Sequence, residues 1–145
     1  MSNQVYSTEN ILIETIALED NITLKLFDDS KRLPDDRWQV TLTARLEIPV
    51  ATLYRGDTEA LPPADELRAA LGDPLVYEHK NVRQFVVTKE RQALRKSLID
   101  TFKAKVFPYI VRHDFHVNYA VAKYREHTKR STWYPGDQPG DTIVS

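Results

Sequence analysis

The feature that most constrains the fold is a strict alternation of apolar and polar residues over residues 38–48. The apolar side chains stand at every second position: Trp38, Val40, Leu42, Ala44, Leu46 and Ile48. Because successive side chains of a β-strand point to opposite faces, this period predicts a long strand with one buried and one solvated face. Pro49 ends it, since proline has no N–H to donate to a sheet ladder.

Three further strands are predicted, over residues 11–18, 22–27 and 75–88. Alternation assigns an inward side to the first two, made of Leu12, Ile16 and Leu18 and of Ile22, Leu24 and Leu26. The polar segment 28–37 predicts a hairpin loop. In the last strand His79 and Arg83 share one side, where they could line an anion site or protect a sheet edge.

The remaining patterns are helical. Pro62 and Pro63 followed by Asp65 and Glu66, with Gly72 after the last turn, predict a short helix. From Lys89 the apolar period becomes that of a helix, with a stripe made of Leu94, Leu98, Ile99, Phe102, Val106 and Tyr109. Pro108 predicts a break near Phe107. Asp114 is a candidate cap for a last helix over about 115–129.

This order of elements predicts an α+β fold. We expect an antiparallel sheet of about four strands, a short connecting helix, and two C-terminal helices packed on one face. A length of 145 residues suits one domain, which we place at residues 1–130. Residues 131–145 contain two prolines and two glycines. They predict a non-helical C-terminal arm packed on its own chain or on a partner chain.

Composition excludes several function classes. The chain has no cysteine, which excludes disulfide bonds, thiolate metal sites and thiol nucleophiles. The N-terminal segment has no basic region and its apolar run is broken by Glu14 and Thr15, so we expect no signal peptide. No apolar run approaches the roughly 20 residues that span a bilayer. We therefore expect a cytoplasmic protein with no membrane partner.

Charge is distributed unevenly along the chain. Residues 1–88 hold 9 Lys and Arg against 15 Asp and Glu, whereas residues 89–130 hold 11 against 4. A basic helical half can bind an anion or a nucleic acid, and the candidate side chains are Arg83, Lys96, Lys103 and Arg112. We do not favour nucleic acid, because the sequence pI of 6.4 is far below that of a typical nucleic-acid-binding domain. Arg95 falls inside the apolar arc of its helix, so we expect it to be partly buried and paired with a carboxylate of the strands.

No motif predicts catalysis, a metal or a cofactor. His113 and His116 lie three residues apart, with His127 further along the same helix, but the first pair straddles the predicted helix start, which spoils the spacing a metal needs. An enzyme that uses His79 or His113 beside a carboxylate is the remaining catalytic alternative. It requires a concave pocket that contains a strongly shifted titratable group.

The last helix favours a binding function. One apolar stripe is formed by Val117, Ala120, Val121 and Tyr124, and a second by Phe115, Tyr119 and Ala122. One stripe can pack on the sheet or the preceding helix, and the other then needs a cover. We therefore predict a non-enzymatic, dimeric or otherwise homo-oligomeric protein- or peptide-binding module. Its expected interface anchors are Val117, Val121, Tyr124, Trp133 and Tyr134.

Overall fold

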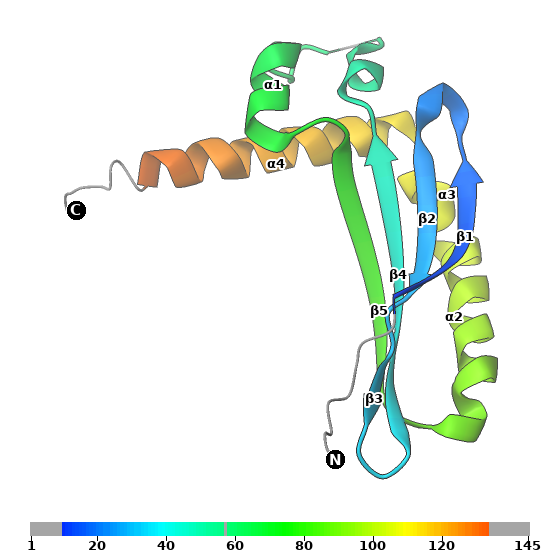
Figure 1. Ribbon diagram of the computed structural model, residues 1–145. Helices are drawn as coiled ribbons and strands as arrows, with labels where there is room; N and C mark the ends of the chain where they lie inside the picture. Colours follow the sequence, from blue (N-terminus) through cyan, green and yellow to red (C-terminus); the bar gives the residue numbers. More distant parts are fainter. Residues whose placement is uncertain (1–9, 57, 134–145) are drawn as a thin grey trace. The chain divides into compact units, whose positions relative to one another are not determined.

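The computed structural model of the protein describes residues 10–56 and 58–133, and the side chains of all of these except residues 131–133. The strands are β1 Ile11–Ala17, β2 Thr23–Asp28, β3 Lys31–Leu33, β4 Arg37–Ile48 and β5 Leu75–Val87. The α-helices are α1 Ala64–Leu71, α2 Arg91–Lys105, α3 Phe107–Ile110 and α4 His113–Trp133. Three short 3₁₀ helices are η1 Glu19–Asn21, η2 Val50–Tyr54 and η3 Thr88–Glu90. The predicted α+β class with an antiparallel sheet is confirmed (Figure 1).

The chain divides into two compact units. The described residues up to Ile48 together with Val76–Val111 form the first, which we call the sheet unit. It contains most of the sheet together with α2 and α3. Pro49–Leu75 and the described residues from Arg112 onward form the second, the helical unit. It contains η2, α1 and α4.

β4 is the central strand of the sheet. Asp28, the last residue of β2, faces Leu42 of β4. Three residues later Lys31, the first residue of β3, faces Gln39, which lies three residues earlier in β4. β2 and β3 therefore follow one register along the same edge of β4, and β5 pairs with the other edge. β1 pairs with β2 and completes the sheet.

The hairpin loop predicted over 28–37 is shorter than expected. Between β2 and β3 the ladder stays closed, because the N–H of Asp29 donates to the carbonyl of Thr41 at 2.9 Å. Only residues 34–36 turn, and Asp35 and Asp36 adopt positive φ angles of 63° and 57°. Asp tolerates this left-handed region better than most residues. The polar segment was predicted as a loop because its strand faces are too polar to show an apolar alternation.

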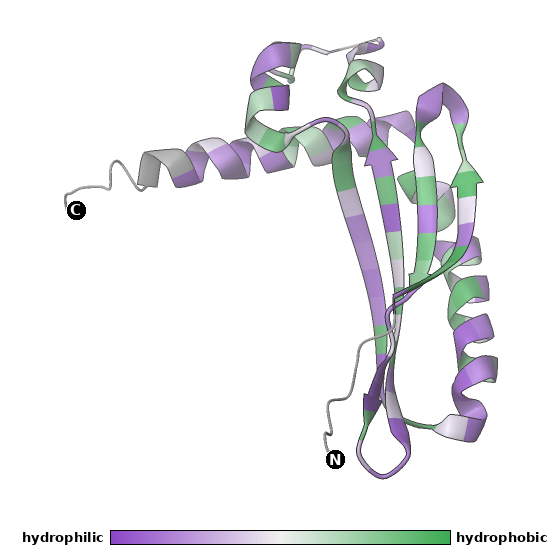
Figure 2. Cartoon of the chain, in the orientation of Figure 1, coloured by the Kyte–Doolittle hydropathy of each residue, from purple (hydrophilic) through white to green (hydrophobic). Residues whose placement is uncertain are grey.

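The predicted buried face of β4 is confirmed, but the prediction that the other face is solvated is wrong, because Thr41 and Thr43 are buried there. The buried apolar side chains of β4 are Trp38, Val40, Leu42, Ala44, Leu46 and Ile48, and those of β2 are Leu24 and Leu26. Helix α2 lies along this face of the sheet (Figures 1 and 2). It contributes the buried Leu98 and Phe102. The predicted break is also present, because α2 ends at Lys105 and α3 begins at Phe107 with Pro108 in its first turn.

The prediction that Leu12 and Ile16 share one side of β1 is wrong. Leu12 faces Phe27 and Ile16 faces Leu24, with a register shift between Leu12 and Glu14. A β-bulge inserts one residue and sends the side chains beyond it to the other face. Leu12 therefore lies on the face opposite α2 and is 50% exposed.

The last helix is longer than the predicted span of 115–129. α4 runs from His113 to Trp133, so the first three residues of the predicted C-terminal arm are helical and only residues 134–145 lie outside the described part. Asp114 sits inside its first turn and accepts the N–H of Phe115 at 3.0 Å. Neither α4 nor any other helix within the described residues has both the length and the apolar composition to cross a bilayer.

Candidate functional site

The helical unit is held together by Asp73, just after α1. One carboxylate oxygen accepts the N–H of Val50 at 3.0 Å and the other accepts Nε of Arg68 at 2.9 Å. The Val50 N–H, with help from the Arg68 guanidinium, lowers the pKa of Asp73 below its usual value of 3.8. These two bonds join η2 to the C-terminal end of α1.

Tyr54 forms a further hydrogen bond within the helical unit. Its phenol O–H donates to the carbonyl of Pro62 at 2.5 Å, and burial raises the pKa of Tyr54. Leu67 is fully buried on the inner side of α1, and α1 packs against α4. Asp73 and Tyr54, whose pKa values are shifted, thus stabilise the helical unit through their hydrogen bonds.

Two predicted interface anchors line hollows along α4. Val117 and Tyr124 are seven residues apart, which is close to two helical turns, so they lie on the same side of the helix. Val117 borders a hollow of about 390 Å³ beside Arg55, Gly56 and Ala60. Tyr124 borders another of about 310 Å³ beside α1. Both side chains are half-buried, as is Val121.

The other two predicted anchors cannot be placed in a site. Only the backbone of Trp133 is described, in the last turn of α4, and Tyr134 lies outside the described residues.

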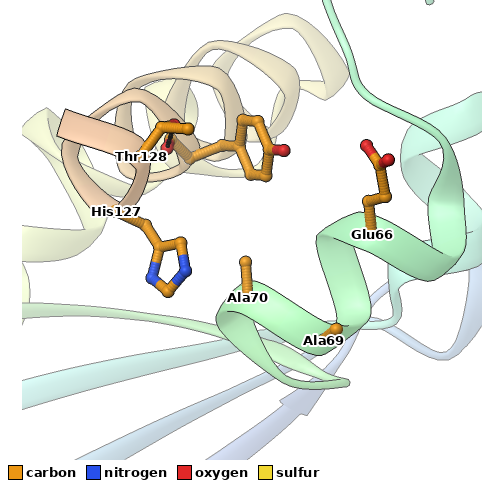
Figure 3. A pocket seen from close by; sticks show the side chains of 6 residues that line it. Glu66, Ala69, Ala70, His127 and Thr128 are labelled. Atoms are coloured by element: carbon orange, nitrogen blue, oxygen red, sulfur yellow. Dashed lines mark hydrogen bonds between the residues drawn. The ribbon is translucent and has the colours of Figure 1, made fainter. Parts of the chain in front are cut away.

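We call the second hollow the α1–α4 hollow. It is lined by Glu66, Ala69 and Ala70 of α1 and by Tyr124, His127 and Thr128 of α4. Figure 3 shows Glu66 and His127 on either side of Ala70. Because alanine ends at Cβ, the α1 wall is shallow and lets a bound chain approach closely. An aromatic ring, a small apolar wall and one carboxylate at the rim are thus brought together.

The charge at this hollow is available to a ligand. Glu66 is exposed, and its carboxylate forms no ion pair with any side chain in the described ranges. The nearby Thr128 hydroxyl donates to the backbone carbonyl of Tyr124 at 2.5 Å. The carboxylate of Glu66 is therefore the polar group of the hollow best placed to select the charge of a ligand.

The three histidines of α4 lie in different environments. Nε2 of His113 lies 3.1 Å from the carbonyl oxygen of Arg55. His116 is only 2% exposed and meets the ring of Phe115 edge-on. His127 lines the α1–α4 hollow. Across residues 10–56 and 58–133, no three His, Asp or Glu side chains are arranged to hold a metal ion.

The candidate anion-binding side chains mostly have carboxylate neighbours of their own. Lys96 lies 3.3 Å from Asp100, Lys103 lies 2.8 Å from Glu14, and Arg112 lies 3.0 Å from Asp114. The fourth, Arg83, donates to the side-chain oxygen of Asn81 and to the carbonyl of Val82. Each of the four side chains thus has a polar partner close to it, and anion binding by them stays a prediction.

Sequence reasoning missed Glu66, Ala69, Ala70 and His127 as site residues. The helices that carry them are far apart in the chain, since α1 ends at Leu71 and α4 begins at His113, so no local pattern links them. The pair of small residues at the end of a short helix was the one available signal. The chain matches no protein-family model, no curated protein and no solved structure.

Proposed function

We propose that the protein is a non-enzymatic protein-binding module whose α1–α4 hollow holds a basic residue of a partner polypeptide, flanked by apolar residues. The observation that carries this proposal is the carboxylate of Glu66, which forms no ion pair with the residues that the structure describes and borders a hollow lined by Tyr124, Ala69 and Ala70. The ion pairs of Lys96, Lys103 and Arg112 are the reason for preferring this hollow over the basic helical half.

The chemistry of the hollow suits an arginine or lysine. The aliphatic stem of such a side chain covers apolar surface while its charged head reaches a polar group. A cation near the face of a tyrosine ring gains about 0.5–1 kcal/mol at an exposed site, and a guanidinium can bind a carboxylate through two hydrogen bonds. Tyr124 and Glu66 supply these two partners from different helices.

The test is a titration of two synthetic peptides that differ in one residue. The probes are Gly-Ser-Leu-Arg-Leu-Ser-Gly and the same peptide with glutamate in place of arginine, followed by amide chemical shifts of the full chain. We expect the arginine peptide to shift amides of α1 and α4, and the glutamate peptide to leave them unchanged. Equal shifts from both peptides, or none from either at millimolar concentration, would contradict the proposal.

Variants assign the binding to named side chains. Glu66→Gln and Tyr124→Ala are each expected to weaken binding of the arginine peptide about tenfold, which corresponds to about 1.4 kcal/mol. Asp65→Asn is the matched control. It removes one carboxylate from the neighbouring position of α1, which does not line the hollow, and should leave binding unchanged.

A further inference from the structure

β5 is an edge strand with a distinctive arrangement of side chains. It pairs with β4 on one side, and no strand in the described part of the chain adds to its other edge. His79 lies on the α2 side of the sheet, with its ring centroid 6.0 Å from that of Phe102. Because sides alternate along a strand, the opposite face carries Val76, Glu78, Lys80 and Val82. Val76 and Val82 are 41% and 40% exposed.

The charged groups on this face are not all paired among the residues that the structure describes. Both contacts of Arg45 with Glu78, at 2.9 and 3.0 Å, go to the same carboxylate oxygen, Oε2. The second oxygen, Oε1, can accept from another cation. Lys80 forms no ion pair with the residues that the structure describes. An acceptor and a cation therefore stand two residues apart on the same face of an edge strand.

We infer that β5 pairs with β5 of a second copy of this chain, antiparallel and with His79 facing His79. In a two-fold symmetric antiparallel pair, the residue on the axis faces its own copy. A centre at His79 places Glu78 opposite Lys80 twice and Val76 opposite Val82 twice. Opposite charges directly across strands stabilise a sheet, whereas like charges destabilise it.

The neighbouring registers are less favourable. A centre at Glu78 or at Lys80 places that residue against its own copy, so like charges meet. A centre at Asn81 leaves Glu78 and Lys80 without charged partners and extends the ladder to Phe85. Phe85 has a φ of 56°, outside the extended region, so regular pairing ends before it. The register centred on His79 needs only residues 75–83.

The second copy explains why this edge bears charges. Lysines on an edge strand protect it against pairing with unrelated strands. In the proposed register the row across the interface reads Arg45, Glu78 and then Lys80 of the other copy, so the signs alternate. The same charges then exclude other strands and select this one. This inference does not depend on peptide binding at the α1–α4 hollow.

The first test uses charge reversal in the full chain, with mass and dissociation constant measured by sedimentation. The wild type is expected at twice the chain mass of 16.8 kDa at high micromolar concentration. Lys80→Glu turns both attractive pairs into Glu–Glu pairs, and we expect it to weaken the dimer at least tenfold. Lys89→Glu is the matched control, with the same change of charge outside the ladder, and should behave as the wild type.

A mixture of two charge-reversal variants restores charge complementarity across the proposed interface. Glu78→Lys alone places lysines opposite each other, whereas a mixture of Glu78→Lys and Lys80→Glu chains pairs Lys with Glu at every position. We expect the mixture to form a heterodimer while each variant alone is mainly monomeric. A monomeric wild type, or a dimer that Lys80→Glu leaves intact, would overturn the inference.

The register has its own test because the chain has no cysteine. Residues directly opposite in an antiparallel pair have Cα atoms about 4.5–5.5 Å apart, within disulfide reach. His79→Cys is therefore expected to form a disulfide-linked dimer on mild oxidation. In Asn81→Cys the two cysteines, one in each copy, lie about four residues out of register, so this variant should not form the disulfide-linked dimer. Cross-linking of Asn81→Cys in preference to His79→Cys would refute the register.

Discussion

At the scale of single residues, Asp28 joins the sheet to α2. It is 1% exposed, and its Oδ2 lies 3.3 Å from Nη1 of Arg95 and 3.5 Å from Nη2 of Arg91. Its Oδ1 accepts the N–H of Ser30 at 3.0 Å and also the Ser30 hydroxyl. The prediction that Arg95 is partly buried and paired with a strand carboxylate is confirmed. A buried charge is tolerated only when it is paired and hydrogen-bonded.

Loss of this carboxylate should be costly. Asp28→Asn removes the buried anion that both Arg91 and Arg95 contact, so we expect the free energy of unfolding to fall by about 3 kcal/mol or more. Glu14→Gln is the control, because Glu14 also joins the sheet to α2, through Lys103, but is 40% exposed. An exposed pair contributes at most about 1 kcal/mol. Urea unfolding measures the free energy of unfolding of both variants. Equal decreases would contradict the stabilising role given to Asp28.

At the scale of elements, Asp73 ties η2 to α1, and the tie depends on pH. The pKa of this carboxyl is lowered in the folded chain, chiefly by the Val50 N–H. The folded state therefore favours the charged form. The stabilisation is fully present above the ordinary value of 3.8 and is lost as the pH falls through the folded value.

We expect Asp73→Asn to lower the free energy of unfolding by about 1 kcal/mol at neutral pH. The difference from the wild type should shrink as the pH falls below about 4, because protonation then removes the same charge from the wild type. Urea unfolding at about pH 7, 5 and 3 measures this. A difference that stays constant over this range would show that the charge of Asp73 does not contribute.

At the scale of the whole molecule, β2 and β4 are the strands of the described chain that have a hydrogen-bonded neighbour on both edges. In contrast, residues 125–130 of α4 are all exposed. Amides open locally where few buried contacts hold them. The length predicts a single domain over residues 1–130, whereas the contacts divide the chain into two compact units, and the single domain stays a prediction.

Hydrogen exchange followed residue by residue tests where the chain opens locally and whether it unfolds as a single domain. We expect the slowest amides in β2 and β4 and the fastest helical amides in residues 125–130. If the chain unfolds as one domain, the slowest amides of the helical unit should reach the same protection limit as those of β4. Protection of residues 125–130 equal to that of β4 would mean that another surface covers this part of α4.

The sequence alone determined the features that depend on a local period or a single residue. The alternation over 38–48 predicted β4, the apolar stripe predicted α2, and Pro108 predicted the break after it. These predictions succeeded because side-chain direction repeats every two residues in a strand and about every 3.6 in a helix. Tyr124 was predicted as an interface anchor from its place on a helical stripe; the structure places it at a hollow, and its role as an anchor stays a prediction.

Only the tertiary structure decided which distant groups meet. Arg95 required a carboxylate, but folding of β2 against α2 selected Asp28, 67 residues away. The bulge in β1 turned Leu12 to the other face, and the packing of α1 on α4 brought Glu66 beside Tyr124. Contacts across such separations depend on how whole elements pack together, and a local pattern carries no record of the neighbour that an element will meet.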